Sequence, residues 1–155
     1  WMQSEDRPEA VRRHARQRGR RRELRAIGRW MRDEEHTSAH AVVLGTYPEI
    51  RTFGRRSLVV SRADLKYIYH LRPGRLDAWA ARLRRADQLL SPAGGPVSAT
   101  ALKAWREELR AEPLYDGAGP WYVVLPATAA LDPAEGLEDV RQAGWGRHVR
   151  LWRLR

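Results

Sequence analysis

The sequence predicts an α/β or α+β fold, a small mixed sheet flanked by helices with a long basic helix at the N-terminus. Apolar residues recur at helical spacing in several segments, and short runs rich in valine and leucine lie between them. Turns rich in glycine and proline separate these segments. With 155 residues, 43% of them hydrophobic and 31% charged, the chain has the composition of a folded protein with a real core.

The first predicted helix spans residues 8–32. Pro8 suits its first turn. A buried stripe along its C-terminal half is predicted from Leu24, Ile27, Trp30 and Met31. Residues 12–22 hold almost no apolar side chain, so this part is expected to face water or a polyanion. Gly19 and Gly28 weaken the helix and could mark a kink.

Two strands are predicted next, over residues 38–44 and 56–60, with a turn after the first. Ser61 and Asp64 resemble a capping box, with aspartate in the usual glutamate position. They predict a short helix over residues 63–70. Its inward side chains are expected to be Leu65, Ile68 and Tyr69.

An amphipathic helix is predicted over residues 76–90, and the proline- and glycine-rich residues 91–96 form the clearest boundary of the chain. The sequence is therefore divided into residues 1–90, which carry the basic helix, and residues 97–155. The second segment is expected to be small and α/β, and it could belong to a further domain.

Within the second segment, Ser98 predicts the N-cap of a helix. Residues 121–125 predict a buried strand. Asp132, followed by proline and then acid, predicts a second capped helix over residues 132–143. Residues 148–154 predict a last strand. Tryptophans at core positions are assigned to packing rather than to stacking on bases: Trp79, Trp105, Trp121 and Trp152.

Nearly all of the net charge lies in residues 12–32, where ten arginines against one glutamate give +9 of the chain's +10. Such a helix is the electrostatic footprint of a surface for nucleic-acid phosphates. The predicted contact residues are Arg12, Arg13, Arg16, Arg18, Arg20, Arg21, Arg22 and Arg25. Their contacts would be independent of base sequence and would weaken with salt. The alternatives are a solvated helix face and a helix that docks on an acidic protein.

No complete catalytic motif accompanies the arginines. The absence of cysteine excludes disulfides and cysteine-ligated zinc. His36 and His40 lie across a predicted helix–strand junction, and the other histidines are isolated, so no metal or other cofactor is expected. The acids Asp33, Glu34 and Glu35 are expected to end the basic helix and to pair with its arginines.

No apolar run approaches the ~18 residues of a membrane-spanning helix, and the N-terminus lacks the apolar stretch of a signal peptide. A cytoplasmic protein without a membrane partner is therefore expected. Because Trp1 precedes Met2, the chain is interpreted as an excerpt of a longer protein or as carrying the remnant of a tag.

Residues 8–90 resemble the C-terminal half of a NERD domain (nuclease-related domain), a family that looks like the PD-(D/E)XK endonuclease fold. The matching segments read RPEAVRRHARQRGRRRELRAIGRWMRDEE, HAVVLGTYPEI and SLVVSRADLKYIYHLRPGRL. The glutamine usual after the helix-starting proline would fall near Val11 or Arg12, and neither is glutamine. The family's metal-binding acids and its E-x-K lie upstream of Trp1. The resemblance therefore implies Mg²⁺-dependent phosphodiester cleavage only for a longer chain.

These observations predict a nucleic-acid-binding, nuclease-related domain that contacts DNA or RNA through its arginine helix. It is expected to belong to a larger prokaryotic protein of antiviral defence or DNA processing, with other domains or subunits as further partners. The alternative is a protein-interaction or assembly module whose basic helix docks on an acidic partner. An independent enzyme is the least favoured interpretation, because no cluster of convergent polar groups is visible in the sequence.

Overall fold

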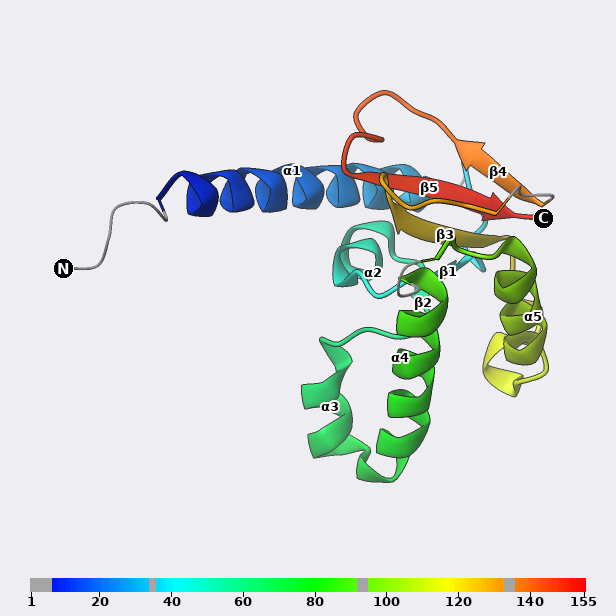
Figure 1. The fold of residues 1–155 in the computed structure, drawn as a ribbon. Helices are drawn as coiled ribbons and strands as arrows, with labels where there is room; N and C mark the ends of the chain where they lie inside the picture. The colour runs from blue at the N-terminus through cyan, green and yellow to red at the C-terminus, as the bar shows by residue number, and fades with distance from the viewer. Residues whose placement is uncertain (1–6, 34–35, 92–94, 133–135) are drawn as a thin grey trace.

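A five-stranded mixed sheet of order β2-β1-β3-β5-β4 lies at the centre of the protein (Figure 1). The computed structural model describes residues 7–33, 36–91, 95–132 and 136–155. The strands are β1 (Val42–Leu44), β2 (Ser57–Leu58), β3 (Trp121–Pro126), β4 (Leu137–Val140) and β5 (Val149–Leu154). The helices are α1 (Arg7–Arg32), α2 (Pro48–Gly54), α3 (Asp64–Leu71), α4 (Leu76–Leu90) and α5 (Ala99–Arg110). The predicted mixed α/β class, with a long N-terminal helix, is confirmed.

The sheet joins the two segments that the sequence divides at residues 91–96. β1 pairs in parallel with β2 on one side and with β3 on the other. β5 then pairs antiparallel with both β3 and β4. The chain thus leaves β1 towards β2 and later returns on the opposite side of β1. This change of direction is a topological switch point between β1 and β3.

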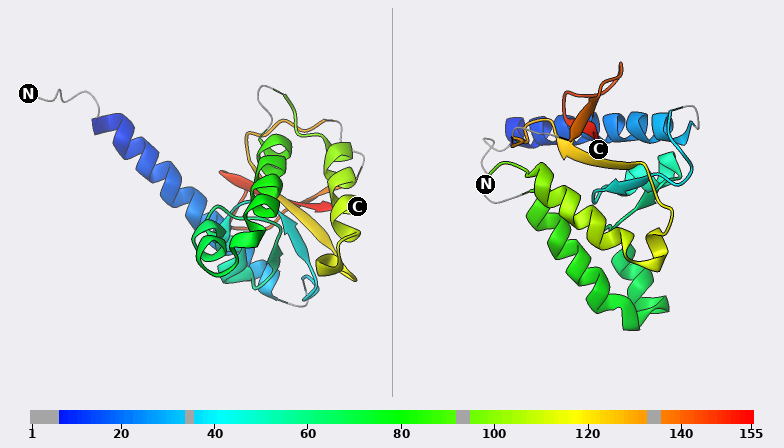
Figure 2. Two further views of the ribbon diagram at one scale, coloured as in Figure 1. Left: turned by 90° about the horizontal axis from the view of Figure 1, so that it is seen from below. Right: turned by 90° about the vertical axis from the view of Figure 1, so that its right-hand side faces the viewer.

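Helices cover both faces of the sheet, and the alternating strand residues show which helices lie on which side. Val43, Tyr122 and Val124 pack in one core with α1 and α2. Val42 and Val123 point the other way, into a second core with α4 and α5. Seen from below in Figure 2, α4 and α5 lie in front of the strands. Because β1 and β3 are covered on both faces, they read as continuous apolar runs.

Only the C-terminal half of α1 packs on the sheet. Leu24, Ile27 and Met31 are buried as predicted. The N-terminal half projects beyond the sheet as a free rod (Figures 1 and 2). α1 runs unbroken through both glycines, so the expected kink is absent. A Cβ on Gly28 would lie 2.8 Å from the Phe53 Cβ, which shows that this glycine serves the close approach of α1 and α2.

The helix predicted over residues 132–143 is wrong. Residues 137–140 form β4, which pairs along β5, while residues 133–135 lie outside the described parts of the chain. The local capping signal at Asp132 was outweighed by pairing with the edge of the sheet. A second difference is α2, which replaces the turn expected after the first strand.

The inward assignment of two α3 side chains is also wrong, because Leu65 is 45% exposed and Tyr69 is 62% exposed. α3 packs against α4 and the turn between them rather than against the sheet. Of the capping predictions, the one at Ser98 is confirmed, because Ser98 is the N-cap of α5 and its Oγ accepts from the Ala101 N–H at 3.3 Å. The capping box at Ser61 forms only in half: Asp64 Oδ2 accepts from the Ser61 N–H at 3.1 Å, but the N-cap of α3 is Ala63 and no side chain caps this helix.

The tryptophan assignments are confirmed, since Trp105 and Trp121 are buried in the α4–α5 core and Trp79 and Trp152 pack partly buried against it. Three acids were expected to end α1. The Oδ2 of the first, Asp33, lies 3.7 Å from the Nδ1 of His36. Glu34 and Glu35 lie outside the described residues.

Candidate functional site

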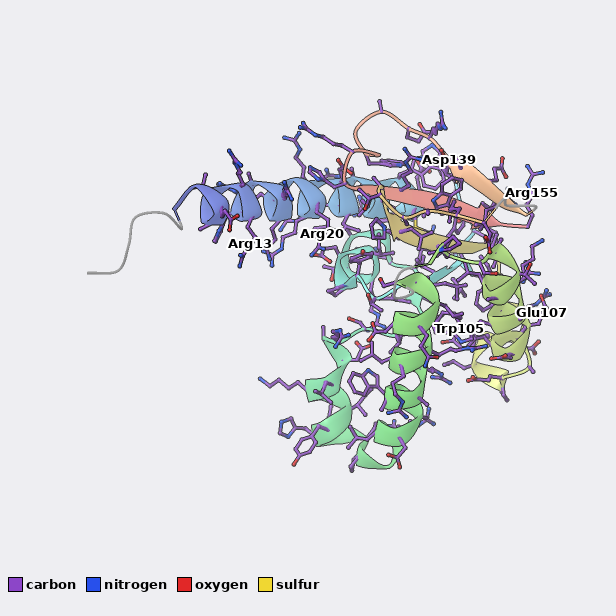
Figure 3. All side chains as sticks on the ribbon, viewed as in Figure 1. Arg13, Arg20, Trp105, Glu107, Asp139 and Arg155 are labelled. Atoms are coloured by element: carbon purple, nitrogen blue, oxygen red, sulfur yellow. The ribbon has the colours of Figure 1, made fainter. Side chains whose placement is uncertain are left out.

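The face of α1 that packs on the sheet continues as arginines where the sheet ends. Arg13, Arg16 and Arg20 follow one another at spacings of three and four residues. The same spacing leads on to the buried residues Leu24 and Ile27. Residues at this spacing lie on one side of a helix. The three arginines are therefore held on the side of α1 that faces the body of the protein, and Figure 3 shows Arg20 nearer to α2 than Arg13.

A pocket of about 420 Å³ lies between these arginines and the sheet. Its lining consists of Arg13, Arg16, Gln17, Arg20, Tyr47, Pro126 and His148. Tyr47 follows β1 and Pro126 is the last residue of β3, so the pocket opens at the carboxyl ends of these two parallel strands. This is the switch point of the sheet, the place where open α/β sheets bind their ligands.

The pocket is strongly cationic, because three arginines line it and no acidic side chain is among the described lining residues. The Arg20 guanidinium lies over the Tyr47 ring, 5.8 Å from its centroid. Burial raises the pKa of the Tyr47 hydroxyl, an effect opposed by Arg20 and reinforced by Glu49. The hydroxyl therefore keeps its proton at neutral pH and can donate a hydrogen bond to an anion.

His148 is brought to the pocket by a buried carboxylate on α1. Glu23 Oε2 accepts from the backbone N–H groups of Gly146, His148 and Val149 at 3.2, 2.9 and 3.0 Å. These bonds fasten the start of β5 to α1. A Cβ on Gly19 would lie 2.4 Å from His148 Nε2, so the imidazole occupies space that only glycine leaves free.

A second basic hollow of about 520 Å³ lies on the opposite flank of α1. It is lined by Ala15, Arg16, Arg18, Gly19, Arg22, Glu23, Gly144, Arg147 and His148. Arg16 and His148 line both hollows, so the cationic surface continues around the helix. Arg147, from the loop before β5, extends this surface beyond α1.

The structure places seven of the eight predicted contact residues in three sets. Arg13, Arg16 and Arg20 converge on the first pocket, whereas Arg18 and Arg22 line the second. Arg21 and Arg25 turn towards α2, where Arg21 lies 4.0 Å from Glu49 and Arg25 lies over the Phe53 ring. Arg12 is exposed.

Several arginines elsewhere in the protein pair with acids. Arg62 pairs with Asp87, Arg82 with Glu112 and Arg85 with Glu108. Within the described parts of the chain, Arg21 is the only one of the eight predicted contact residues that pairs with a carboxylate. The positive charge of α1 is thus left available to a ligand.

Four residues of this surface have no sequence signal that marks them: Gln17, Tyr47, Arg147 and His148. They come from α1, the end of β1 and the loop before β5, which only the fold brings together. His148 was interpreted as an isolated histidine. One usable hint was that Tyr47 lies three residues after the predicted strand over residues 38–44, because carboxyl ends of strands collect functional residues.

No group of three or more His, Asp or Glu side chains suited to a metal ion occurs within the described residues. Nor does any helix in the described ranges have the length and apolarity needed to cross a membrane. A pocket of about 560 Å³ lies at the other end of the protein between α3, α4 and β2. Trp79 and Ile68 form part of its wall, and Arg72 and Arg75 lie at the α3–α4 turn.

A comparison with protein-family models, with curated proteins and with solved structures finds no match to this chain. The resemblance to nuclease-related domains therefore stays a prediction from the sequence.

Proposed function

We propose that the protein is a nucleic-acid-binding domain that holds the sugar–phosphate backbone against α1. The observation that carries the proposal is the projecting half of this helix, whose arginines are exposed and, apart from Arg21, have no acidic partner within the described chain. An exposed rod of guanidinium groups is complementary to the closely spaced phosphates of a nucleic acid.

The contacts are with the backbone rather than with bases. Guanidinium groups bind phosphate oxygens bidentately. The tryptophans assigned to packing lie in or against the core, and the exposed half of α1 carries no Phe, Tyr or Trp that could stack on a base. Binding is therefore expected to depend weakly on base sequence.

The family resemblance extends this proposal to a larger protein of prokaryotic defence or DNA processing. In such a protein α1 would hold the backbone beside an active site built from other segments. Mg²⁺ would belong to that site, and no residue of this chain is assigned to it.

The test is a salt titration. We expect fluorescence anisotropy with a labelled duplex to show a plot of log affinity against log salt with a slope of about −4, because each of four or five neutralised phosphates contributes about −0.9. With a labelled single strand the slope should be about −3, because each phosphate contributes about −0.7. An affinity that does not change with salt contradicts the proposal.

A quadruple variant, Arg12→Gln, Arg13→Gln, Arg16→Gln and Arg20→Gln, should bind more weakly and with a shallower slope. Because these side chains are exposed, its circular dichroism and midpoint of thermal unfolding should match those of the wild type. Absence of binding to any nucleic acid, together with stable binding of an acidic protein, would favour the assembly-module alternative.

A further inference from the structure

The pocket between α1 and the switch point of the sheet gathers three arginines without an acid among its described lining residues. Arg13, Arg16 and Arg20 lie along one side of α1 and face Tyr47 and His148 across a volume of about 420 Å³. The second hollow also gathers arginines, but the carboxylate of Glu23 is part of its lining. Convergent donors suit a single compact anion, whereas divergent ones suit an extended polyanion.

We propose that this pocket binds a terminal phosphate, the phosphate monoester at the end of a nucleic-acid strand. The inference rests on the proposed function and assigns one of its contacts. It predicts that the protein prefers strands that carry a phosphorylated end over the same strands that end in a hydroxyl.

Charge is the first reason for a monoester. At neutral pH a monoester carries about −1.5 to −2 and presents three terminal oxygens, whereas an internal phosphodiester carries −1 and presents two. Three guanidinium groups with no acid among the described lining residues favour the more highly charged group. The Tyr47 hydroxyl, which keeps its proton, adds a neutral donor.

The shape of the phosphate itself is the second reason. Pro126 and Tyr47 line the pocket from the sheet, and His148 lies against Gly19 on the helix, while the three arginines beside them are exposed. A terminal phosphate can turn three free oxygens towards these donors, because only one ester bond leads away from its phosphorus. An internal phosphate has two ester bonds and only two free oxygens to offer.

The third reason is that the wall of the pocket is held in place. Glu23 fixes the backbone of His148 through a buried, triply hydrogen-bonded carboxylate oxygen. Leu24 and Ile27 anchor the next turns of α1 in the core. The arginines are therefore presented from a rigid element, which lowers the entropic cost of binding a small anion.

The experiment compares four probes of one base sequence by anisotropy and competition: an oligonucleotide with a 5′-phosphate, one with a 3′-phosphate, one with hydroxyls at both ends, and the free mononucleotide. We expect one phosphorylated end to bind at least about tenfold tighter than the hydroxyl form, the factor expected from one additional charge-assisted hydrogen bond.

Two double variants separate the pocket from the general charge. Arg13→Gln/Arg20→Gln removes two pocket residues, and its matched control, Arg12→Gln/Arg18→Gln, removes two arginines of the same helix that do not line the pocket. The pocket variant should bind phosphorylated and hydroxyl ends with equal affinity. The control should bind every oligonucleotide more weakly but keep the wild-type ratio.

Equal, salt-dependent binding of all three oligonucleotides by the wild type would overturn the terminal-phosphate site and leave the proposed function standing. Binding of the mononucleotide without binding of any oligonucleotide would assign the pocket to a free nucleotide and contradict both proposals. If both double variants lose the preference for a phosphorylated end to the same degree, general charge and not the pocket produces that preference.

Discussion

The carboxylate of Glu23 and the backbone N–H of His148 are 2.9 Å apart, although 125 residues separate them in the chain. The same oxygen also accepts from Gly146 and Val149. This contact ties the basic helix to the last strand at the point where the core ends and the cationic surface begins. Glu23, the one acid in residues 12–32, thus has a structural role and does more than lower the net positive charge of the helix.

Replacing Glu23 tests this role. Glu23→Ala leaves three backbone donors without their acceptor, so the free energy of unfolding should fall by about 3 kcal/mol. Glu23→Gln keeps an acceptor oxygen and should cost about 1 kcal/mol. Urea denaturation measures both. A Glu23→Ala variant as stable as the wild type would show that these hydrogen bonds contribute nothing.

Gly28→Ala should destabilise the protein by about 1–3 kcal/mol. The added Cβ would lie 2.8 Å from the Phe53 Cβ and 3.2 Å from the Gly54 N, atoms that cannot move without moving α2. The better helix propensity of alanine adds at most about 1 kcal/mol to the free energy of unfolding. Thermal and urea denaturation check the result, and an increase in stability would contradict the close packing of α1 on α2.

Gly19→Ala is the matched substitution in the same helix, with a different expected outcome. Its Cβ would meet the end of the His148 ring, a side chain that can rotate away. Stability should therefore change by less than about 1 kcal/mol. The displaced imidazole should lower the preference for a phosphorylated end, measured as the ratio of affinities. An unchanged ratio would show that His148 has no part in the site.

Alkaline pH should reveal the buried tyrosines. Burial raises the pKa of Tyr47 and of Tyr115 above the usual 10.0. The unfolded chain then loses these protons at a lower pH than the folded chain. The contribution of these two tyrosines to the free energy of unfolding is therefore fully present below the unfolded pKa and is lost as the pH rises through the folded pKa values. Denaturation between about pH 9 and 11 measures this slope. Tyr47→Phe should make it shallower, and an identical slope would contradict the shift.

The sequence predicted the elements whose apolar pattern extends over many residues or is supported by a second signal. α1, α4 and α5 repeat apolar residues over several turns, and the six residues of β3 are apolar. α2 was missed because seven residues are too short to show a helical period and because Pro48 is also typical of a turn. The strand at residues 137–140 was missed because its partner, β5, lies beyond a long loop and a local capping pattern favoured a helix.

The candidate site was only half predictable. The arginines stand out because charge clustering is visible in one segment. Which of them converge depends on the phase of α1 relative to the sheet, and Tyr47 and His148 join them through parallel pairing of β1 with β3 and through the Glu23 contact. Such long-range relationships leave no local pattern in the sequence.

Under the proposed function, the projecting part of α1 would also set the length of nucleic acid that one molecule holds. Residues 9–22 rise about 21 Å at ~1.5 Å per residue, which equals about six base pairs at ~3.4 Å per step. A major groove about 12 Å wide admits a helix. Arginines on several sides of the rod can then reach both strands at once. Affinity should fall steeply for duplexes shorter than about six base pairs, and longer duplexes should bind several molecules side by side.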